Sequence, residues 1–509
     1  MRILIFHGYL LRGTGSNIYN AELCRALVRL GHEVHLLCQD RNAAELDFVD
    51  AVARPGEDPG PARCTVWLPD IGRVLPVYVA DRYEGFDAVP YPDLDDAAVE
   101  RYVEANVAAV REVAGRVRPD VALANHLIMG PAILRRGLDG RVPYAMKVHG
   151  SALEYTVRPH PDRFLPWALE GVRGAAGVLV GSRHTAESLW EVLADEPSLP
   201  ERTRLGPPGV DVHAFRPRPA AEAAQAVRSL ADRVEGGRAA DWGGEAGAAE
   251  ALRALDPRRD RIVSYVGKLI VSKGLDLLLA AWPLVVGTVP EARLVIVGFG
   301  TYRDALGRFV AALSAGDLDT LRDIAARGRE LEGGPAGELG YLRAFLDRVD
   351  EDDYRRLGRE AAPRVHFTGR LEHGDLPDLV AACEAQVMPS TFPEAFGMVA
   401  AEAAACGALP LSAGHSGMAE VTATLAPALD EELRPLLSFR VGPDAVEEIA
   451  AKLVTWLTLE PEVRERARAA LAEEAHRRYS WESVAEGVIA AAEGRLEALP
   501  SPPSGVSNG

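Results

Sequence analysis

Residues 261–300 read RIVSYVGKLIVSKGLDLLLAAWPLVVGTVPEARLVIVGFG and contain three elements in succession. RIVSYVGKL (261–269) begins with β-branched and aromatic residues and predicts a buried strand. LDLLLAAWPLVV (275–286) predicts a helix, and ARLVIVGFG (292–300) predicts the next strand. A strand, a helix and a second strand in this order predict a parallel βαβ unit whose sheet is covered by helices on both faces.

The same alternation recurs on both sides of this unit. Further runs that predict strands are 2–6, 32–39, 121–126, 144–150, 177–182, 365–369, 385–390 and 408–413, and helical patterns lie at 16–31, 376–384 and 397–406. Between the two series, GPPGVDVHAFRPRP (206–219) is dense in proline and glycine and predicts a boundary. The pattern predicts an α/β fold with two doubly wound, Rossmann-like domains, which face each other across a cleft if both bind one ligand.

The chain divides at this boundary. We expect a first domain at 1–212 and a second at 213–477, a last helix at 478–498 that packs back on the first domain, and a disordered tail at 499–509. Two segments of the second half, 220–258 and 303–362, are too long for simple βα connections and carry helical patterns. We therefore interpret them as helical insertions.

Composition limits the partners of the chain. A net charge of −18 without a distinct basic face argues against nucleic acid as the main partner. The sequence has no run of eighteen apolar residues, so we expect no transmembrane helix. In MRILIFHGYLL the apolar run before His7 is too short for a signal peptide. Five scattered cysteines without ligand spacing fit a reducing compartment. We expect a cytoplasmic protein and leave peripheral membrane contact open.

Lysine is rare in this chain. Among 56 basic residues only Lys147, Lys268, Lys273 and Lys452 are lysine. Lys268 and Lys273 share the loop VGKLIVSKG (266–274), after a predicted strand and before a predicted helix. Because ligands bind outside the carboxyl ends of parallel strands, two ammonium groups there suit a diphosphate. The alternative is a pair of solvated loop lysines.

The loop after the first predicted strand is also a candidate binding loop. In HGYLLRGTGSN (7–17), Gly13 and Gly15 allow a phosphate or sugar to approach the backbone before a helix N-terminus. A dinucleotide fingerprint needs a third glycine where Ile18 stands, although Asp40 at the end of the second strand resembles a ribose ligand. The missing glycine disfavours NAD.

The stretch FPEAFGMVAAEAAACG (392–407) has two glutamates around a helix start. The first free amides, near Phe396, Gly397, Met398 and Val399, point at an anion, and Gly397 keeps the approach open. Glu394, just outside the helix, can accept hydrogen bonds from hydroxyls attached to that anion. Glu402 lies about 7 Å along the axis from Gly397 and can hold a ribose hydroxyl pair. The alternative is an acid near a helix N-terminus plus an ordinary exposed glutamate.

Five motifs together resemble the retaining glycosyltransferases of family 4, which have the GT-B fold. They are the glutamate pair of 394–402, VGKLIVSKG, GPPGVDVHAFRP, HGYLLRGTGSN and KVHG (147–150), and the resemblance spans most of residues 1–490 apart from the two insertions. The chain departs from the family where Lys268 replaces an arginine and Pro208 replaces an asparagine. The first departure retains a charge but loses a bidentate fork.

The resemblance implies roles for the matching residues. His149 would lie beside the transferred sugar, with a packed strand-end histidine as the alternative, and Gly15 would approach the donor. Lys268 and Lys273 would neutralise the leaving diphosphate, Glu394 would hold donor-sugar hydroxyls, and Glu402 would hold the ribose. The residues expected to act in catalysis are His149, Glu394, Lys268 and Lys273.

The resemblance implies transfer of a sugar, most simply a hexose, from a nucleoside-diphosphate sugar with retained configuration. We expect no metal or other cofactor, because lysines and helix amides can stabilise the leaving diphosphate. The carboxylates of DLDD (93–96) lie outside the candidate loops. The acceptor, whether saccharide, lipid-linked or small molecule, is not determined. Alternatives are a sugar-nucleotide epimerase, a phosphorylase, and a non-catalytic nucleotide-sugar sensor.

Overall fold

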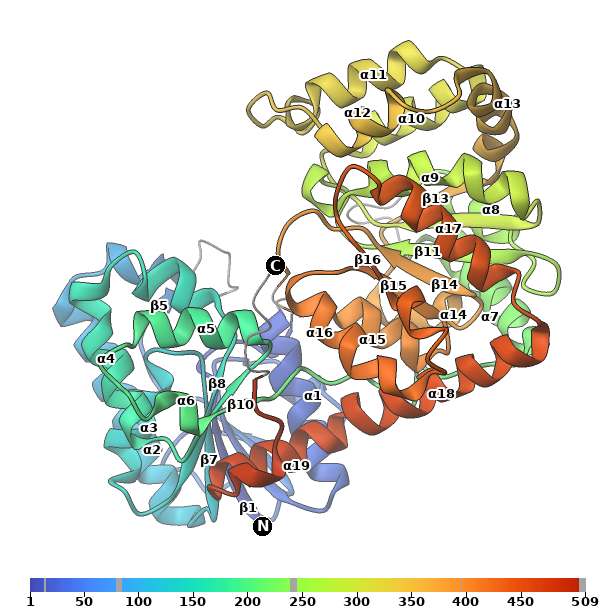
Figure 1. Cartoon of the computed structure of the whole chain (residues 1–509). Coiled ribbons are helices and arrows are strands. Elements are labelled where there is room, and N and C mark those ends of the chain that lie inside the picture. The colour runs from blue at the N-terminus through green and yellow to red at the C-terminus, as the bar shows by residue number, and fades with distance from the viewer. Residues whose placement is uncertain (13–14, 79–84, 239–244, 395, 503–509) are drawn as a thin grey trace. The chain divides into compact units, whose positions relative to one another are not determined.

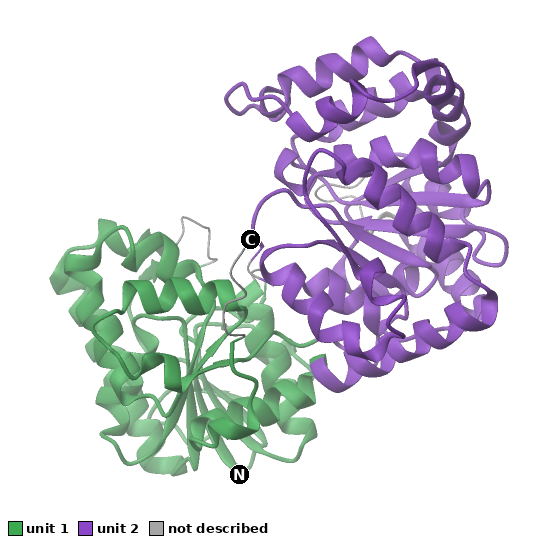
Figure 2. Ribbon diagram, in the orientation of Figure 1, with its two compact units in different colours: residues 1–209, 479–509 green, residues 210–478 purple. Residues whose placement is uncertain are grey.

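The computed structural model describes residues 1–12, 15–78, 85–238, 245–394 and 396–502, and the chain divides into two compact units (Figures 1 and 2). Unit 1 comprises residues 1–209 and 479–509, and unit 2 comprises residues 210–478. The chain passes back into unit 1 at the end of α18 (Pro461–Tyr479).

Unit 1 is built on an eight-stranded parallel sheet with the order β10-β9-β8-β7-β1-β2-β4-β3. Its strands are β1 (Arg2–Phe6), β2 (Glu33–Leu37), β3 (Ala51–Ala53), β4 (Cys64–Trp67), β7 (Val121–Asn125), β8 (Tyr144–Val148), β9 (Gly177–Val180) and β10 (Thr203–Leu205). A separate parallel pair consists of β5 (Val74–Val77) and β6 (Asp87–Pro90). The sequence patterns missed β3, β4, β5, β6 and β10, which are three or four residues long and give only a short stretch in which a period could be recognised.

Helices cover both faces of this sheet. They are α1 (Gly15–Arg29), α2 (Asp96–Val117), α3 (Gly130–Leu138), α4 (Pro161–Gly174), α5 (Arg183–Val192), α6 (Leu199–Arg202) and α19 (Trp481–Ala492). One core cluster joins the sheet to α2, α3 and α4, and another joins it to α1 and α19. The last helix therefore packs against the first helix of the chain, on unit 1 (Figure 1).

Unit 2 contains a six-stranded parallel sheet with the order β13-β12-β11-β14-β15-β16. The strands are β11 (Arg261–Val266), β12 (Ala292–Val297), β13 (Val365–Gly369), β14 (Ala385–Met388), β15 (Leu409–Ala413) and β16 (Ser438–Phe439). The main helices beside it are α9 (Leu275–Thr288), α14 (Leu376–Val380), α15 (Met398–Ala405), α16 (Ser416–Leu425) and α17 (Ala445–Leu457). The prediction of two doubly wound parallel sheets is confirmed.

The two segments interpreted as insertions are helical and belong to unit 2. The first holds α7 (Ala220–Arg233), the π-helical turn η4 (Val234–Arg238) and α8 (Ala248–Arg253), with α7 packed on α14 and α8 on the edge strand β13. The second holds α10 (Arg303–Ala315), α11 (Leu318–Arg327), α12 (Gly340–Leu346) and α13 (Glu351–Ala361). Of these, α10, α12 and α13 contact α9 (Figure 1).

The start of the predicted tail is ordered, and in this respect the prediction of a disordered segment at 499–509 is wrong. Leu499 packs against the core of unit 1, and the Pro500 carbonyl accepts the Leu205 N–H at 2.8 Å. Apolar burial and a backbone hydrogen bond outweigh the loop-like composition of these residues. Residues 503–509 lie outside the described part of the chain.

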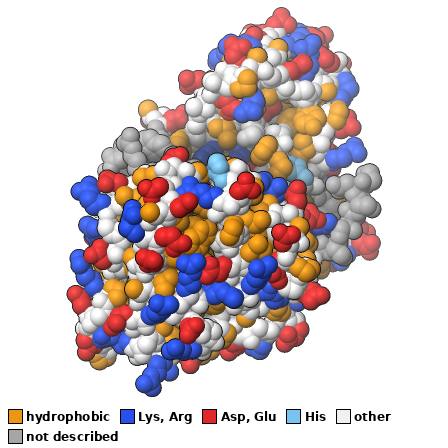
Figure 3. Space-filling view, turned by 90° about the vertical axis from the view of Figure 1, so that its left-hand side faces the viewer, with side chains coloured by type: hydrophobic (Ala, Val, Ile, Leu, Met, Phe, Trp, Pro, Cys, Tyr) orange, Lys and Arg blue, Asp and Glu red, His pale blue; other side chains and the backbone are white. Residues whose placement is uncertain are grey.

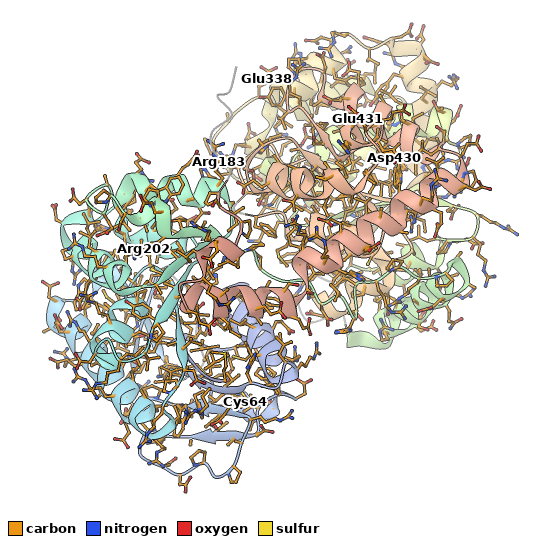
Figure 4. All side chains as sticks on the ribbon, turned by 60° about the horizontal axis from the view of Figure 1, so that its bottom comes forward. Cys64, Arg183, Arg202, Glu338, Asp430 and Glu431 are labelled. Atoms are coloured by element: carbon orange, nitrogen blue, oxygen red, sulfur yellow. The ribbon has the colours of Figure 1, made fainter. Side chains whose placement is uncertain are left out.

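The cysteines lie in the interior, and charged side chains of both signs lie on the surface (Figure 3). All five cysteines are free and buried, among them Cys64 in β4 (Figure 4). Acidic and basic side chains are interspersed over the face shown in Figure 3. Among the described residues, no helix has both the length and the apolar character needed to cross a bilayer.

Candidate active site

The topology of unit 2 brings two loops to the same edge of its sheet. β11 and β14 are neighbours at the position where the strand order reverses. A doubly wound sheet binds ligands at such a position, outside the carboxyl ends of its strands. The segments that follow these two strands are 267–274 and 389–397, and they touch, because the Thr391 N–H donates to the Ser272 carbonyl at 2.9 Å.

The first of these segments has a defined conformation. Its turn η5 (Val271–Lys273) ends at Gly274, which has φ 65°. A Cβ on Gly274 would lie 2.0 Å from the Pro389 carbonyl oxygen, so only glycine permits this approach of the two loops. Lys268 precedes the turn with an exposed side chain, and its carbonyl accepts the Tyr265 hydroxyl at 2.8 Å.

Lys273 and Glu394 form an ion pair across the two loops. Lys273 Nζ donates to Glu394 Oε1, and Ser390 Oγ donates to the same oxygen at 2.8 Å. The side chains of the pair keep 28% and 24% exposure, so they line the surface of the site. The Glu394 N–H donates to Ser416 Oγ at 2.9 Å and fixes the backbone there. Within the described residues, Glu394 Oε2 accepts no hydrogen bond.

The helix α15 starts beside this pair. Gly397 is its N-cap residue and makes no side-chain cap, and Phe396 precedes it half-buried. In the part of the chain that the structure describes, the N–H groups of Met398 and Val399 have no acceptor, which is usual for a first helical turn. The Val399 carbonyl is held by Gln386 Nε2 of β14 at 2.9 Å. The start of α15 therefore presents two donors in a fixed direction.

Glu402 is buried, and the alternative of an ordinary exposed glutamate is wrong. Its side chain is 6% exposed, and its Oε1 accepts a hydrogen bond from His373 Nε2 at 2.8 Å. His373 begins the turn η8 (His373–Asp375) after β13, and its ring lies 5.5 Å from the Phe215 ring. The sequence patterns did not single out His373, because no local motif surrounds it.

In unit 1 the strand order reverses between β1 and β7. The loop after β1 contains Gly13, which lies outside the described residues, and Gly15, the first residue of α1. A Cβ on Gly15 would meet no atom of the described residues within 4 Å.

A chain of hydrogen bonds links the loops of unit 1. His7 Nδ1 accepts from Asn20 Nδ2 at 3.1 Å, and Asn20 Oδ1 accepts from Asn125 Nδ2 at 2.7 Å. Asn125 Oδ1 accepts from His149 Nε2 at 2.9 Å. Burial lowers the pKa of His7 to about 4, so this imidazole is neutral at pH 7 and its Nδ1 is an acceptor.

His149 follows β8 at the end of this chain. Burial, then His126, Lys147 and His7, lower the pKa of His149 well below its ordinary value. The ring is therefore neutral and packs edge-on against Tyr19, with ring centroids 5.1 Å apart. Because Nε2 donates to Asn125, Nδ1 is left as an acceptor.

His126 is a residue that the sequence patterns missed. It directly follows β7, has φ 66° and is 3% exposed. Its ring lies 4.6 Å from Tyr78 and 5.0 Å from His149, and neither of its nitrogens has a hydrogen-bond partner among the residues that the structure describes. Such buried orphan groups are rare and cost about 1–3 kcal/mol each. The available signal was its place at a strand end, which also marks His149.

Lys147 has a structural place in unit 1. It is 2% exposed, its Nζ donates to the Gly206 carbonyl, and burial lowers its pKa to about 7. Gly209, three residues after Gly206, packs against Trp481, because a Cβ on Gly209 would lie 2.4 Å from Trp481 Cδ2. Lys147 and Trp481 thus anchor the end of unit 1 from which the chain leaves.

Two of the three carboxylates of DLDD have structural partners. Asp95 Oδ1 accepts the Ala98 N–H at 2.6 Å and caps α2, and Asp96 pairs with Arg163 at 2.7 Å. No group of three or more His, Cys, Asp or Glu side chains among the described residues is arranged to hold a metal ion.

Two family models match parts of the chain on either side of the lysine loop 267–274, which lies outside both matches. The model of "Glycosyltransferase Family 4" matches residues 13–214, and that of "Glycosyl transferases group 1" matches residues 349–474. The chain belongs to the family 4 glycosyltransferases with the GT-B fold.

Curated relatives of this glycosyltransferase carry related names. A "GDP-mannose-dependent monoacylated alpha-(1-6)-phosphatidylinositol monomannoside mannosyltransferase" of Corynebacterium glutamicum is 28% identical over 33% of this chain and 33% of its own length. A "D-inositol 3-phosphate glycosyltransferase" of Segniliparus rotundus is 25% identical over 57% of this chain and 46% of its own length. A protein of the same name from Xylanimonas cellulosilytica is 25% identical over 93% of this chain and 90% of its own length. The first two matches thus span less than half of each relative.

Solved structures share the overall fold of this glycosyltransferase. Sucrose-phosphate synthase from Thermosynechococcus elongatus has a TM-score of 0.51 and 19% identity, with 98% of this chain and 99% of that chain covered. The Anabaena protein HepE in complex with UDP has a TM-score of 0.53 and 17% identity, with 98% and 100% covered.

Proposed function

We propose that this glycosyltransferase moves a sugar from a nucleoside-diphosphate sugar to an acceptor, with retention of the anomeric configuration and without a metal or other cofactor. The observation that carries the proposal is the arrangement in unit 2, where Lys273 pairs with Glu394 beside the two free amides that start α15. This arrangement offers positive charge and aligned N–H donors to a diphosphate.

Transfer breaks the bond between the anomeric carbon and a diphosphate oxygen, and negative charge grows on the departing oxygen. Groups that stabilise this charge accelerate the reaction when they interact more strongly in the transition state than with bound donor. In the proposal Lys273, Lys268 and the amides of Met398 and Val399 do this, since a compact ammonium can follow the shifting charge.

Glu394 and Glu402 have separate roles in the proposal. Glu394 Oε1 is occupied by Lys273 and Ser390, so Oε2 is the oxygen offered to a hydroxyl of the donor sugar. Glu402 is nearly buried and already accepts from His373. A ribose would therefore share this carboxylate with His373 or displace it. Since both glutamates are held by hydrogen bonds, little side-chain freedom is lost when a donor binds.

The histidines of unit 1 support a hydroxyl-bearing ligand there. Neutral imidazoles offer one donor and one acceptor each, which complements a hydroxyl group. His149 keeps Nδ1 as an acceptor, and both nitrogens of His126 lack partners within the described ranges of the chain. In the proposal His149 lies beside the transferred sugar, Gly15 approaches the donor, and His126 binds a sugar or cyclitol hydroxyl of the acceptor side. The five free cysteines support a reducing, cytoplasmic location.

The experiment uses the full chain with radiolabelled UDP-glucose and GDP-mannose, because relatives and structural neighbours name both nucleotides. Acceptors to offer are D-inositol 3-phosphate, which the names of two relatives contain, and simple saccharides. We expect nucleoside diphosphate release coupled to a new glycoside of the donor's anomeric configuration, unchanged by chelator. Epimerised donor, phosphorolysis, or binding without turnover would each contradict transfer. Turnover that vanishes with chelator and returns with manganese or magnesium would contradict metal independence.

A further inference from the structure

The segment 303–362 brings one side chain to the lysine loop. Glu332 ends the single turn η6 (Arg329–Glu332), and its Oε2 accepts the Val271 N–H at 2.7 Å. Val271 is the first residue of η5, which has no side-chain cap of its own because Ile270 precedes it. The first N–H groups of a helical turn have no partner within the turn. Glu332 therefore caps, from 61 residues away, the turn that ends in Lys273.

The same turn is also held by the segment that precedes Glu394. The Ser272 carbonyl accepts a hydrogen bond from the Thr391 N–H at 2.9 Å. Thr391 lies three residues before Glu394, the partner of Lys273. Two separate elements thus fix the backbone of this turn, and with it the direction in which the Lys273 side chain leaves the loop.

Glu332 is itself held in place. Its side chain is 11% exposed, and its Oε1 pairs with Arg329 at 3.3 Å. Gly328, which precedes the turn with φ 49°, has no room for a Cβ, since that atom would lie 1.8 Å from the Gly337 carbonyl oxygen. The segment is tied to α9, the helix that follows the lysine loop, because Tyr354 of α13 donates its hydroxyl to the Ala280 carbonyl at 2.8 Å. Figure 1 shows α10 to α13 gathered beside α9.

We propose that the segment 303–362 is a positioning module for the diphosphate loop, with Glu332 as its positioning residue. The inference rests on the proposed function, in which Lys273 meets the leaving diphosphate. The hydrogen bond to Val271 restricts the turn to the conformation in which Lys273 reaches Glu394, so the ammonium is pre-organised before the donor arrives. Since the carboxylate is paired with Arg329, its role depends on an acceptor oxygen rather than on a net negative charge.

The test is calorimetric titration of the full chain with UDP and GDP, and with UMP and GMP as probes that lack the second phosphate. We expect Glu332→Ala to weaken diphosphate binding about tenfold and monophosphate binding less than about twofold. Glu332→Gln keeps an oxygen acceptor for Val271 and should bind like the wild type. Glu330→Ala is the matched control, because Glu330 lies in the same turn, is 49% exposed and pairs with Arg327.

Each outcome decides one point. If the wild type binds UDP or GDP and a folded Glu332→Ala variant binds it equally well, the positioning role is wrong while the proposed function stands. If Glu332→Gln loses as much affinity as Glu332→Ala, the charge rather than the acceptor matters, and the inference is overturned. Equal losses for diphosphate and monophosphate with a lower unfolding midpoint would show a general structural role instead. A wild type that binds neither diphosphate overturns the proposed function and this inference with it.

Discussion

Replacing Lys273 with alanine should separate catalysis from stability. The Lys273 and Glu394 side chains keep 28% and 24% exposure, and a solvent-accessible ion pair contributes at most about 1 kcal/mol to folding. The unfolding midpoint should therefore fall by no more than about 2–4 °C. Loss of a donor that stabilises developing charge lowers turnover far more, by about a hundredfold or about 2.7 kcal/mol. Because this charge is largest in the transition state, kcat should fall more than donor affinity.

The assay measures kcat and KM for the donor that is turned over, together with thermal unfolding of each variant. Lys268→Arg retains the charge and should be much milder. Lys452→Arg is the control outside the site, since Lys452 Nζ donates to the Pro435 carbonyl at 2.7 Å and pairs with Glu448. Its replacement should leave kcat unchanged, whatever its effect on the midpoint. A folded Lys273→Ala variant that keeps turnover within about threefold of wild type would refute the role of Lys273.

Three further predictions concern the carboxylate and histidine groups. Glu402→Ala should weaken UDP or GDP binding by about 1.5–3 kcal/mol in calorimetry, and His373→Ala should weaken it less, because it leaves the ribose acceptor in place. Burial lowers the pKa of His7 from 6.5 to about 4, so between these pH values the unfolded chain binds more protons than the folded chain. The free energy of unfolding should therefore decrease as the pH is lowered through this range, by about 3 kcal/mol for His7 alone. Thermal unfolding between pH 7 and 4 should show a shallower slope for His7→Asn, and an unchanged slope would refute this. His126→Phe removes two orphan nitrogens, so its midpoint should be no lower than wild type while transfer slows; transfer at the wild-type rate would remove His126 from the site.

Sequence patterns sufficed for the parts of the protein that depend on local structure. Stretches such as 261–300, in which apolar strand runs alternate with helical patterns, predicted the parallel strands and their helices. Each strand run is nearly continuous in apolar residues because a parallel sheet is buried on both faces. Strand ends followed by glycines and charges marked the loops of Lys268, Lys273 and Glu394, since parallel topology makes every such loop emerge at the same edge of the sheet. The short strands β3 and β10 could not be found this way.

Tertiary structure decided the contacts between distant segments, which no local period records. The sequence placed Glu402 on a helix, but only packing showed it to be buried against His373. The sequence showed His126 only as a residue at a strand end, whereas the structure shows that no other described residue bonds to either of its nitrogens. The segment 303–362 appeared as an insertion of unreadable role, and only its packing on α9 brings Glu332 to Val271. Periodicity reports which face of an element is buried, whereas the partner of a polar atom depends on how those elements pack in three dimensions.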